Sequence, residues 1–352
     1  MHACQALQAV KYCATAGKNR QWFFVRQGNA MSIIFALVCI VLFLFLFAAT
    51  LSGILYWYET LNTPCEEIPS PRPGLFSCAY LFFQSLMGYA TAIVLYPIGF
   101  FWQKKPSPLS PDTDCPKPPV ILVHGLNDNA SALLFWYFRL KKQGYQPFTF
   151  AYFSLFVPFE KTMARFDDFV HMVEASFPGK KPLLVGHSLG GLIIRRWLAQ
   201  GENGRRPLGV VTVASPHGGS KMAVFAPGNL SKLLLPGSAF ITELEAQEQP
   251  VSLPCVSLVS PIDEAVLPAA SLLPPKGWKM RVTNRASHHS MLFCRRVFKL
   301  LLEELGAIED GARSIIRPES GPEEAAASPV QPIEEQDAAS RTEPAPEDNA
   351  GK

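Results

Sequence analysis

A serine within a Gly-x-Ser-x-Gly pattern is the residue of this chain best placed to do chemistry. The pattern, Gly186-His187-Ser188-Leu189-Gly190, follows a short apolar run at 183–185 and precedes a helix-like segment at 192–200. This order places a serine on a sharp strand-to-helix turn that exposes its hydroxyl, and the glycines allow close packing around it. The turn also aims the amide of Leu189 at the start of a helix, where positive partial charge collects. We therefore predict that Ser188 is a nucleophile.

A nucleophilic serine needs two partners: an imidazole that takes its proton and a carboxylate that holds the imidazole. Two loops after Ser188 supply these groups. Asp263 follows the strand-like run 255–259, and His288 follows a second such run at 280–282. We predict that His288 is the general base and that Asp263 orients it.

Each of these assignments has a competitor beside it in the sequence. Glu264 directly follows Asp263, and His289 directly follows His288. We favour His288 because it lies on the loop, whereas the residues after it begin a helix with an apolar pair. Asp128 precedes the serine in the chain, and its early loop could help to shape the site.

The attack of a serine on a carbonyl also requires N–H donors for the oxygen that becomes negative. The apolar run 120–123 leads into His124-Gly125-Leu126, a turn that contains glycine. An amide of this turn, which we assign to Leu126, can join the Leu189 amide in holding that oxygen. We therefore predict an oxyanion hole at Leu126 and Leu189.

These residues fall in a region, 119–308, in which strand-like apolar runs alternate with longer amphipathic segments. Such alternation implies an α/β fold with a mostly parallel sheet that is covered by helices on both faces. The expected strands are 120–123, 148–152, 183–185, 210–213, 255–259 and 280–282, and the expected helices are 130–142, 160–177, 192–200 and 289–305.

Taken together, these motifs resemble those of bacterial triacylglycerol lipases and esterases of the α/β-hydrolase superfamily. The resemblance covers residues 117–307 and includes the serine turn, Asp263 and His288. Its other segments are Val123-His124-Gly125-Leu126, Ala214-Ser215-Pro216-His217-Gly218-Gly219-Ser220 and Leu235-Pro236-Gly237-Ser238.

The resemblance implies a compact α/β-hydrolase fold that begins at the family's third strand. It also implies ester hydrolysis through an acyl-serine intermediate, with neither a metal nor an organic cofactor. Substrate-binding roles are expected for His124, Gly125, His187 and His217. The apolar segment 222–244 could line an acyl pocket, act as a small lid or pack into the core.

Two apolar segments without charged residues precede this region. The first, 31–58, is longer than the roughly 20 residues that cross a hydrocarbon core, and longer than the ~7–15 apolar residues of a signal peptide. We predict a transmembrane helix there, although Met31 is an alternative start that would remove the basic arm 1–30. The second segment, 79–102, is less purely apolar and either spans the membrane or lies at its interface.

The basic residues around these segments favour a hairpin with both ends in the cytoplasm. Four basic residues precede the first segment, Arg72 alone lies between the two, and Lys104 and Lys105 follow the second. Because cytoplasmic flanks are enriched in Lys and Arg, we expect a cytoplasmic catalytic domain at a bacterial inner membrane. Cys65 and Cys78 would then face an oxidising space and could pair. A single span with the domain outside is the alternative.

The composition excludes several other classes of protein. A net charge of +3 with 17% charged residues provides no basic surface for nucleic acid. The eight cysteines form neither a CxxC pair nor a cluster with histidine at zinc spacing, so no metal site is predicted.

Two segments outside the catalytic region have the composition of unstructured chain. Residues 103–118 form a proline-rich linker. The Pro-, Glu- and Ala-rich stretch 309–352 is predicted to be a disordered acidic tail.

The sequence thus predicts a membrane-anchored serine hydrolase whose partners are the membrane and a lipid or acyl-ester substrate. Two alternatives remain at this point. A thioesterase or an acyltransferase would use the same three residues, and a catalytically silent α/β-hydrolase scaffold could serve as a membrane interaction module.

Overall fold

The computed structural model describes residues 32–33, 35–102, 117–247 and 253–316. The chain divides into two units after Ala312, and the sheet and both long N-terminal helices belong to the first unit. The predicted basic arm, the predicted linker up to residue 116 and the predicted tail from residue 317 lie outside the described residues.

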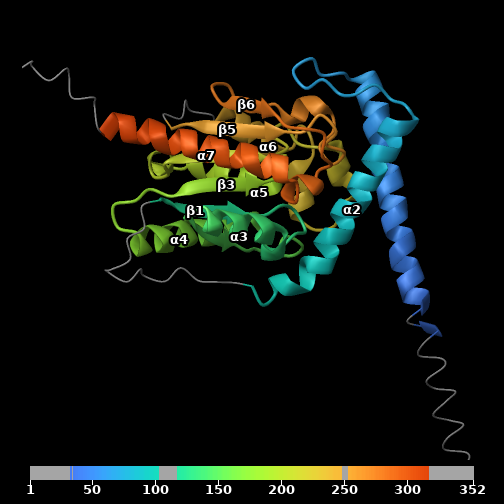
Figure 1. Ribbon diagram of the computed structural model, residues 1–352, viewed down its shortest axis with the longest axis horizontal. Coiled ribbons are helices and arrows are strands. Elements are labelled where there is room, and N and C mark those ends of the chain that lie inside the picture. Colours follow the sequence, from blue (N-terminus) through green and yellow to red (C-terminus); the bar gives the residue numbers. More distant parts are fainter. Residues whose placement is uncertain (1–31, 34, 103–116, 248–252, 317–352) are drawn as a thin grey trace, which may run out of the picture. The chain divides into compact units, whose positions relative to one another are not determined.

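Six parallel strands form one sheet in the order β2-β1-β3-β4-β5-β6 (Figure 1). The strands are β1 (Pro119–Val123), β2 (Gln146–Phe150), β3 (Leu183–His187), β4 (Gly209–Val213), β5 (Cys255–Val259) and β6 (Lys279–Val282). Every residue of β1, β3, β4 and β5 is buried, which explains why these strands are nearly continuous apolar runs. The predicted α/β architecture with a parallel sheet is confirmed.

Helices cover both faces of this sheet and form two apolar cores. On one face lie α3 (Leu134–Lys142) and α7 (Arg295–Ile316), around the fully buried Trp136. On the other face lie α4 (Phe159–Ser176), α5 (Leu189–Leu198) and α6 (Ala239–Ala246), around the fully buried Trp197.

Helix α7 extends beyond the predicted boundary of the catalytic region. The expected tail begins at residue 309, yet the helix continues to Ile316. Ile308 and Glu309 are still buried, at 4% and 5% exposure, and Glu309 contacts the hydroxyl of Tyr145. The start of the predicted tail is therefore helical because these side chains pack against the domain.

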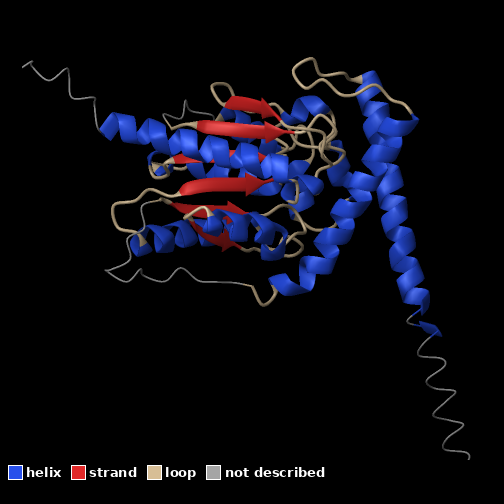
Figure 2. Ribbon diagram, in the orientation of Figure 1, coloured by secondary structure: helices blue, strands red, loops and turns tan. Residues whose placement is uncertain are grey.

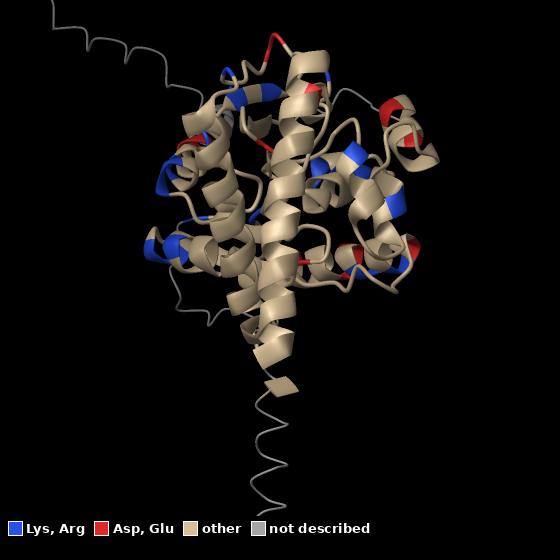
Figure 3. Ribbon diagram, turned by 90° about the vertical axis from the view of Figure 1, so that its right-hand side faces the viewer, with Lys and Arg blue, Asp and Glu red and all other residues tan. Residues whose placement is uncertain are grey.

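Two long apolar helices precede the sheet, as predicted. They are Phe35–Asn62 and α2 (Leu75–Gly99), and both are long and apolar enough to cross a membrane. Figure 3 shows them nearly free of charged residues, which lie instead on the flanks of the molecule. Cys65 and Cys78, for which pairing was considered, are both free thiols.

Helix α2 lies along the sheet-containing domain, at the edge toward which the strand arrowheads point (Figure 2). Near its start, the Tyr80 hydroxyl donates to the Arg285 carbonyl (2.9 Å), and near its end Asn129 Nδ2 donates to the Tyr96 carbonyl (2.8 Å). Between them, a Cβ added at Gly88 would lie 3.0 Å from the Cβ of His289. The helix thus contacts the domain along its whole length.

The loop between the two helices is also anchored in the domain. Ile68 is fully buried in a cluster with Val259, Val266 and Leu272, which belong to β5 and the segments that follow it. The hairpin is therefore fastened at its turn by apolar packing as well as along α2.

We expect Ile68→Ala to reduce the free energy of unfolding by about 2–5 kcal/mol, because the substitution opens a cavity in a fully packed cluster. Thermal unfolding of the purified protein measures this loss. Leu61→Ala is the matched control: Leu61 lies just before the same loop but is 63% exposed, so its loss should stay within about 0.5 kcal/mol. Equal effects of the two substitutions would contradict the anchoring of the loop.

Candidate active site

Ser188 occupies a strained turn between β3 and α5. Its backbone has φ +52° and ψ −124°, a conformation that is uncommon for a residue other than glycine. Two hydrogen bonds hold this turn: the Ser188 N–H donates to the Val213 carbonyl (2.9 Å), and the Gly191 N–H donates to the Ser188 carbonyl (3.0 Å). This is the strand–turn–helix geometry expected for a nucleophilic serine.

Glycines beside Ser188 make this close packing possible. A Cβ at Gly190 would lie 2.3 Å from the Val123 carbonyl oxygen, and a Cβ at Gly186 would lie 2.5 Å from the Gly191 nitrogen. Both contacts are with backbone atoms, which cannot move aside like the end of a side chain. Any larger residue would therefore push α5 away from β1 or distort the turn.

The structure brings Asp263 and His288 together at the carboxyl end of the sheet. His288 Nδ1–H donates to both carboxylate oxygens of Asp263, at 2.9 and 3.0 Å. The Asp263 carboxylate also accepts the main-chain N–H groups of Ala265 and Val266, each at 3.1 Å. These bonds fix the carboxylate, and they leave Nε2 of the imidazole free for a second partner.

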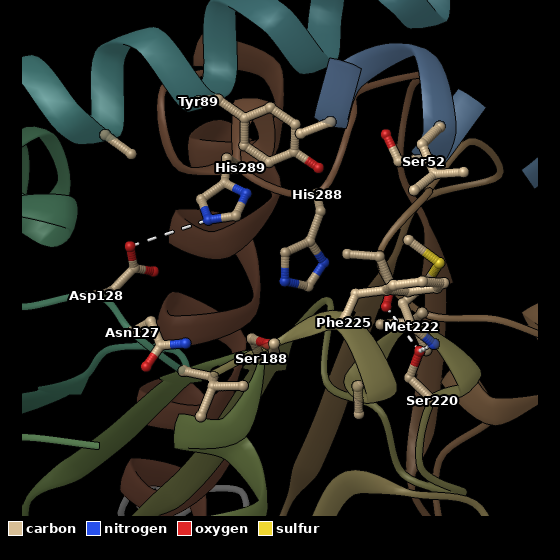
Figure 4. A pocket seen from close by; sticks show the side chains of 18 of the residues that line it. Ser52, Tyr89, Asn127, Asp128, Ser188, Ser220, Met222, Phe225, His288 and His289 are labelled. Carbon is tan, nitrogen blue, oxygen red and sulfur yellow. Dashed lines mark hydrogen bonds and ion pairs between the residues drawn. The ribbon is translucent and has the colours of Figure 1, made fainter. Parts of the chain in front are cut away.

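The His288 ring lies above Ser188 in the cavity (Figure 4). In the part of the chain that the structure describes, no hydrogen bond joins the Ser188 hydroxyl to this ring. Such contacts are often long when substrate is absent. Ser188 and His288 nevertheless line the same cavity, and Asp263 is bonded to the imidazole at Nδ1.

The two competing residues occupy different positions. Glu264 Oε2 accepts the main-chain N–H of His288 (3.0 Å), so this acid holds the backbone of the loop and not the ring. His289 packs its ring edge-on against Tyr89, and its Nε2 lies 3.9 Å from Asp128. The geometry therefore favours Asp263 and His288 over their neighbours.

Burial and nearby acids set the protonation of these groups. Burial lowers the pKa of His288, but the charge and hydrogen bond of Asp263 outweigh it, and the pKa is raised above its ordinary value. Burial raises the pKa of Glu264 and that of Asp128 to about 7 each. Burial lowers the pKa of His289 to about 3. Near neutral pH, His289 is therefore neutral, whereas His288 can gain a proton that Asp263 stabilises.

The two amides predicted to hold an oxyanion flank Ser188. Leu189 is the first residue of α5, where main-chain N–H groups have no partner within the helix. Leu126 lies in the turn after β1, and within the described residues its N–H has no hydrogen-bond partner. By contrast, the N–H of the next residue, Asn127, donates to Ser154 Oγ (2.8 Å). The Asn127 amide is thus occupied, and the assignment of the second donor to Leu126, which lines the cavity, stays a prediction.

The four residues expected to bind substrate lie behind the cavity wall instead. Burial lowers the pKa of His124 to about 4, and that of His217 well below its usual value. His124 stacks on Tyr152 with ring centroids 4.2 Å apart. His217 accepts a hydrogen bond from Arg195 (3.2 Å) at its Nδ1, away from Ser188. Both are neutral histidines that hold loops in place.

His187 and Gly125 also support the site from below. His187 is 1% exposed, and its Nε2 lies 3.3 Å from the His288 carbonyl oxygen. A Cβ at Gly125 would lie 3.1 Å from both His187 and Ser188. All four residues are buried by neighbouring groups and none lines the cavity over Ser188, so their predicted contact with substrate stays a prediction that this geometry does not favour.

A cavity of about 640 Å³ opens above Ser188 and His288. Residues of the segment 222–244 form part of its wall, as one of the sequence-based alternatives proposed, and Asp128 and His289 form another part. The N-terminal helix (Phe35–Asn62) and α2 form a further part of the wall. The sequence had predicted membrane-associated helices for these segments but no contact with the cavity. The polar and small residues Gln84, Ser85 and Gly88 in α2 could have indicated that this helix packs against the domain, because a helix that faces only lipid needs none of them.

Within the described residues, no group of three or more His, Cys, Asp or Glu side chains is arranged to hold a metal ion. Ser188, His288, His289 and Asp128 are among the polar residues that line the cavity, together with the hydroxyl and amide side chains of Ser52, Tyr89, Tyr96, Asn127 and Ser220. This set can carry out nucleophilic attack with proton transfer on a carbonyl compound.

Comparison with known protein families supports this fold. The model of the alpha/beta hydrolase family matches residues 120–339. A search of curated proteins found no match. Among solved structures, the mature lipase BlEst2 of Bacillus licheniformis is 18% identical, with 57% of this chain and 96% of that chain covered and a TM-score of 0.48.

Two further solved structures are similar to this chain. The monoacylglycerol lipase of Paleococcus ferrophilus is 18% identical, with 54% of this chain and 94% of that chain covered and a TM-score of 0.42. Lipase B of Aspergillus fumigatus is 14% identical, with 56% of this chain and 55% of that chain covered and a TM-score of 0.49.

We expect Gly190→Ala to destabilise the protein by about 1–3 kcal/mol, because its Cβ would overlap the Val123 carbonyl and overpack the turn. Gly306→Ala in α7 is the matched control: no atom lies within 4 Å of its added Cβ, so it should stabilise the helix by up to about 1 kcal/mol. Chemical denaturation of both variants measures the difference. A neutral Gly190→Ala would show that β1 and α5 are not in close contact at this turn.

Proposed function

Because the chain belongs to the alpha/beta hydrolase family, we propose that it is a membrane-anchored serine hydrolase that cleaves lipid or acyl esters. One observation carries the proposal. Ser188 lies on a strained turn at the base of an apolar cavity, His288 lines the same cavity, and the buried Asp263 is hydrogen-bonded to the His288 ring. The three groups have the chemical roles that acyl transfer to a serine requires.

In the proposed reaction, Ser188 Oγ attacks the ester carbonyl as His288 Nε2 takes the hydroxyl proton. Asp263 stabilises the imidazolium through the bonds at 2.9 and 3.0 Å. The carbonyl oxygen becomes negative and accepts hydrogen bonds from the main-chain N–H groups of Leu126 and Leu189. Collapse of this intermediate breaks the bond to the alcohol, which leaves with the proton from His288.

The acyl-serine that remains is hydrolysed by the same groups in reverse. His288 takes a proton from water, and the resulting hydroxide attacks the acyl carbonyl. Ser188 then leaves as the alkoxide and regains its proton from His288. The products are a carboxylic acid and the free enzyme, and the protein's own residues supply every proton transfer.

Membrane association is proposed through the N-terminal hairpin. The helix Phe35–Asn62 exposes large apolar side chains over most of its first half, among them Phe35 at 71% and Phe43 at 65%. Such a surface is unstable in water and compatible with lipid. Because α2 contacts the domain along its length, the interfacial alternative for this helix is favoured over a second span. The distribution of basic residues favours a cytoplasmic domain for a hairpin that crosses the membrane twice, whereas a single span would put the domain on the side opposite the N-terminus.

The first test is turnover of p-nitrophenyl esters by the wild type and by Ser188→Ala. We expect Ser188→Ala to lower kcat by at least about 10³-fold, because the substitution removes the hydroxyl that attacks the carbonyl in the proposed reaction. A fluorophosphonate probe should label the wild type and not the variant. Equal turnover by the two proteins would refute the proposed nucleophile. Turnover of acyl thioesters but not of oxygen esters would favour a thioesterase.

The second test is the pH dependence of kcat/KM. The general base must be neutral, and Asp263 raises the pKa of His288 above the ordinary value of about 6.5. Activity should therefore fall as the pH drops through an apparent pKa higher than that value. Asp263→Asn removes the charge, so it should shift the apparent pKa downward and lower kcat by about 10⁴-fold.

Glu264→Gln is the matched comparison for Asp263→Asn. Its side-chain oxygen can still accept the His288 main-chain N–H, so its loss of kcat should be much smaller. If Glu264→Gln lost as much activity as Asp263→Asn, or more, Glu264 would be the partner of the imidazole.

A further inference from the structure

The N-terminal helix and α2 each direct one regular face into the cavity above Ser188. The lining positions repeat every three or four residues, which is the spacing of a single helical face. On the N-terminal helix they are Val41, Leu44, Phe45, Ala48, Leu51 and Ser52. On α2 they are Tyr89, Ala92, Ile93 and Tyr96. The cavity therefore lies between the hairpin and the catalytic loops.

Polar contacts hold the hairpin against the loops that carry the proposed catalytic residues. Tyr56 donates to the Pro261 carbonyl (2.6 Å), two residues before Asp263. Ser290 Oγ donates to the Gln84 carbonyl (2.7 Å), two residues after His288. Because both catalytic loops are bonded to the hairpin, its position relative to Ser188 is defined by the fold.

An ion pair fixes the end of the first helix. Lys221 Nζ lies 2.8 Å from Glu59 Oε1 and 3.0 Å from Oε2, and Glu59 is only 8% exposed. Lys221 immediately precedes the segment 222–244 that forms another part of the cavity wall. The hairpin is thus joined to a third element of the site, and it does not behave as a flexible tether.

The lining that the N-terminal helix contributes is graded in polarity, whereas α2 contributes the hydroxyl-bearing Tyr89 and Tyr96 beside Ala92 and Ile93. The groups able to hydrogen-bond to an ester cluster near Ser188, with Ser52 as the polar end of the lining on the N-terminal helix. Beyond Ser52, the lining of this helix is entirely apolar back to Val41. From Val41 to Ser52 the helix rises by about 16 Å along its axis. An extended apolar chain fits such a slot, whereas an acetyl group would leave most of it empty.

We propose that the N-terminal helix and α2 form the acyl-binding half of the active site, in which the hydrocarbon chain of a long-chain acyl ester lies between them. The proposal rests on the proposed function and deepens it. The outer faces of both helices are also apolar, with Met87 at 62% and Val94 at 75% exposure. The acyl chain of the substrate therefore enters the cavity from the lipid side, and the ester carbonyl reaches Ser188 without passing through water.

The test introduces a bulky side chain from each helix separately into the space between the N-terminal helix and α2, which we call the acyl slot. Ala48→Trp and Ala92→Trp place a large ring between the helices. We expect each to lower kcat/KM for p-nitrophenyl palmitate at least tenfold while turnover of the butyrate ester stays within about threefold. Leu46→Trp and Val94→Trp are the matched controls, because both residues are exposed and neither lines the cavity. Their ratio of palmitate to butyrate turnover should equal that of the wild type.

Unchanged chain-length preference in both Ala48→Trp and Ala92→Trp would overturn the proposal, as would an equal loss for both esters in correctly folded protein. Failure of the proposed function has a different signature: the wild type would show no serine-dependent turnover of either ester.

A binding measurement on Ser188→Ala separates the two questions. A palmitate analogue with a photoreactive diazirine on its chain should label residues of the N-terminal helix and α2, and Ala48→Trp in the same background should abolish this labelling. Labelling confined to the outer faces of the helices would count against the slot, whatever the catalytic result.

Discussion

The close approach of α5 to β1 is the constraint on which the rest of the site depends. Gly190 has no room for a side chain because the Val123 carbonyl lies where its Cβ would be. This contact holds Ser188 at a positive φ, so its hydroxyl points out of the sheet and into the cavity. The strain is sustained by a core that is fully buried on both sides of β3. A looser sheet would let the turn relax and withdraw the nucleophile.

Burial of the charged groups is the second consequence of this packing. Asp263 and His288 are 2% and 4% exposed, and a buried carboxylate is costly unless it is hydrogen-bonded. Main-chain amides and the imidazole supply those bonds. The hairpin increases the effect, because it covers the pair and excludes water that would screen the charges. The same cover that creates the cavity therefore strengthens the coupling between acid and base.

The fold and the pairing of Asp263 with His288 could be predicted because their signals are local. Buried parallel strands are short apolar runs, and Ser188, Asp263 and His288 each follow one. The roles of His124 and His217 could not be predicted, since burial and pairing with Tyr152 and Arg195 depend on contacts between distant segments. The contribution of the two N-terminal helices to the cavity wall could not be predicted from the sequence for a related reason. A helix that faces lipid and a helix that faces an acyl chain have the same apolar composition.

That shared composition is also what would allow one hairpin to have both proposed roles, membrane association and acyl binding. A helix between water and a protein core needs one polar face, whereas a helix between lipid and an acyl slot needs none. What such a helix does need is a fixed position, because apolar surfaces alone specify neither rotation nor depth. The Tyr56 and Tyr80 hydroxyls and the Glu59–Lys221 pair provide directional contacts of this kind. They lie toward the loop end of the hairpin, so the apolar faces beyond them stay available to hydrocarbon on both sides.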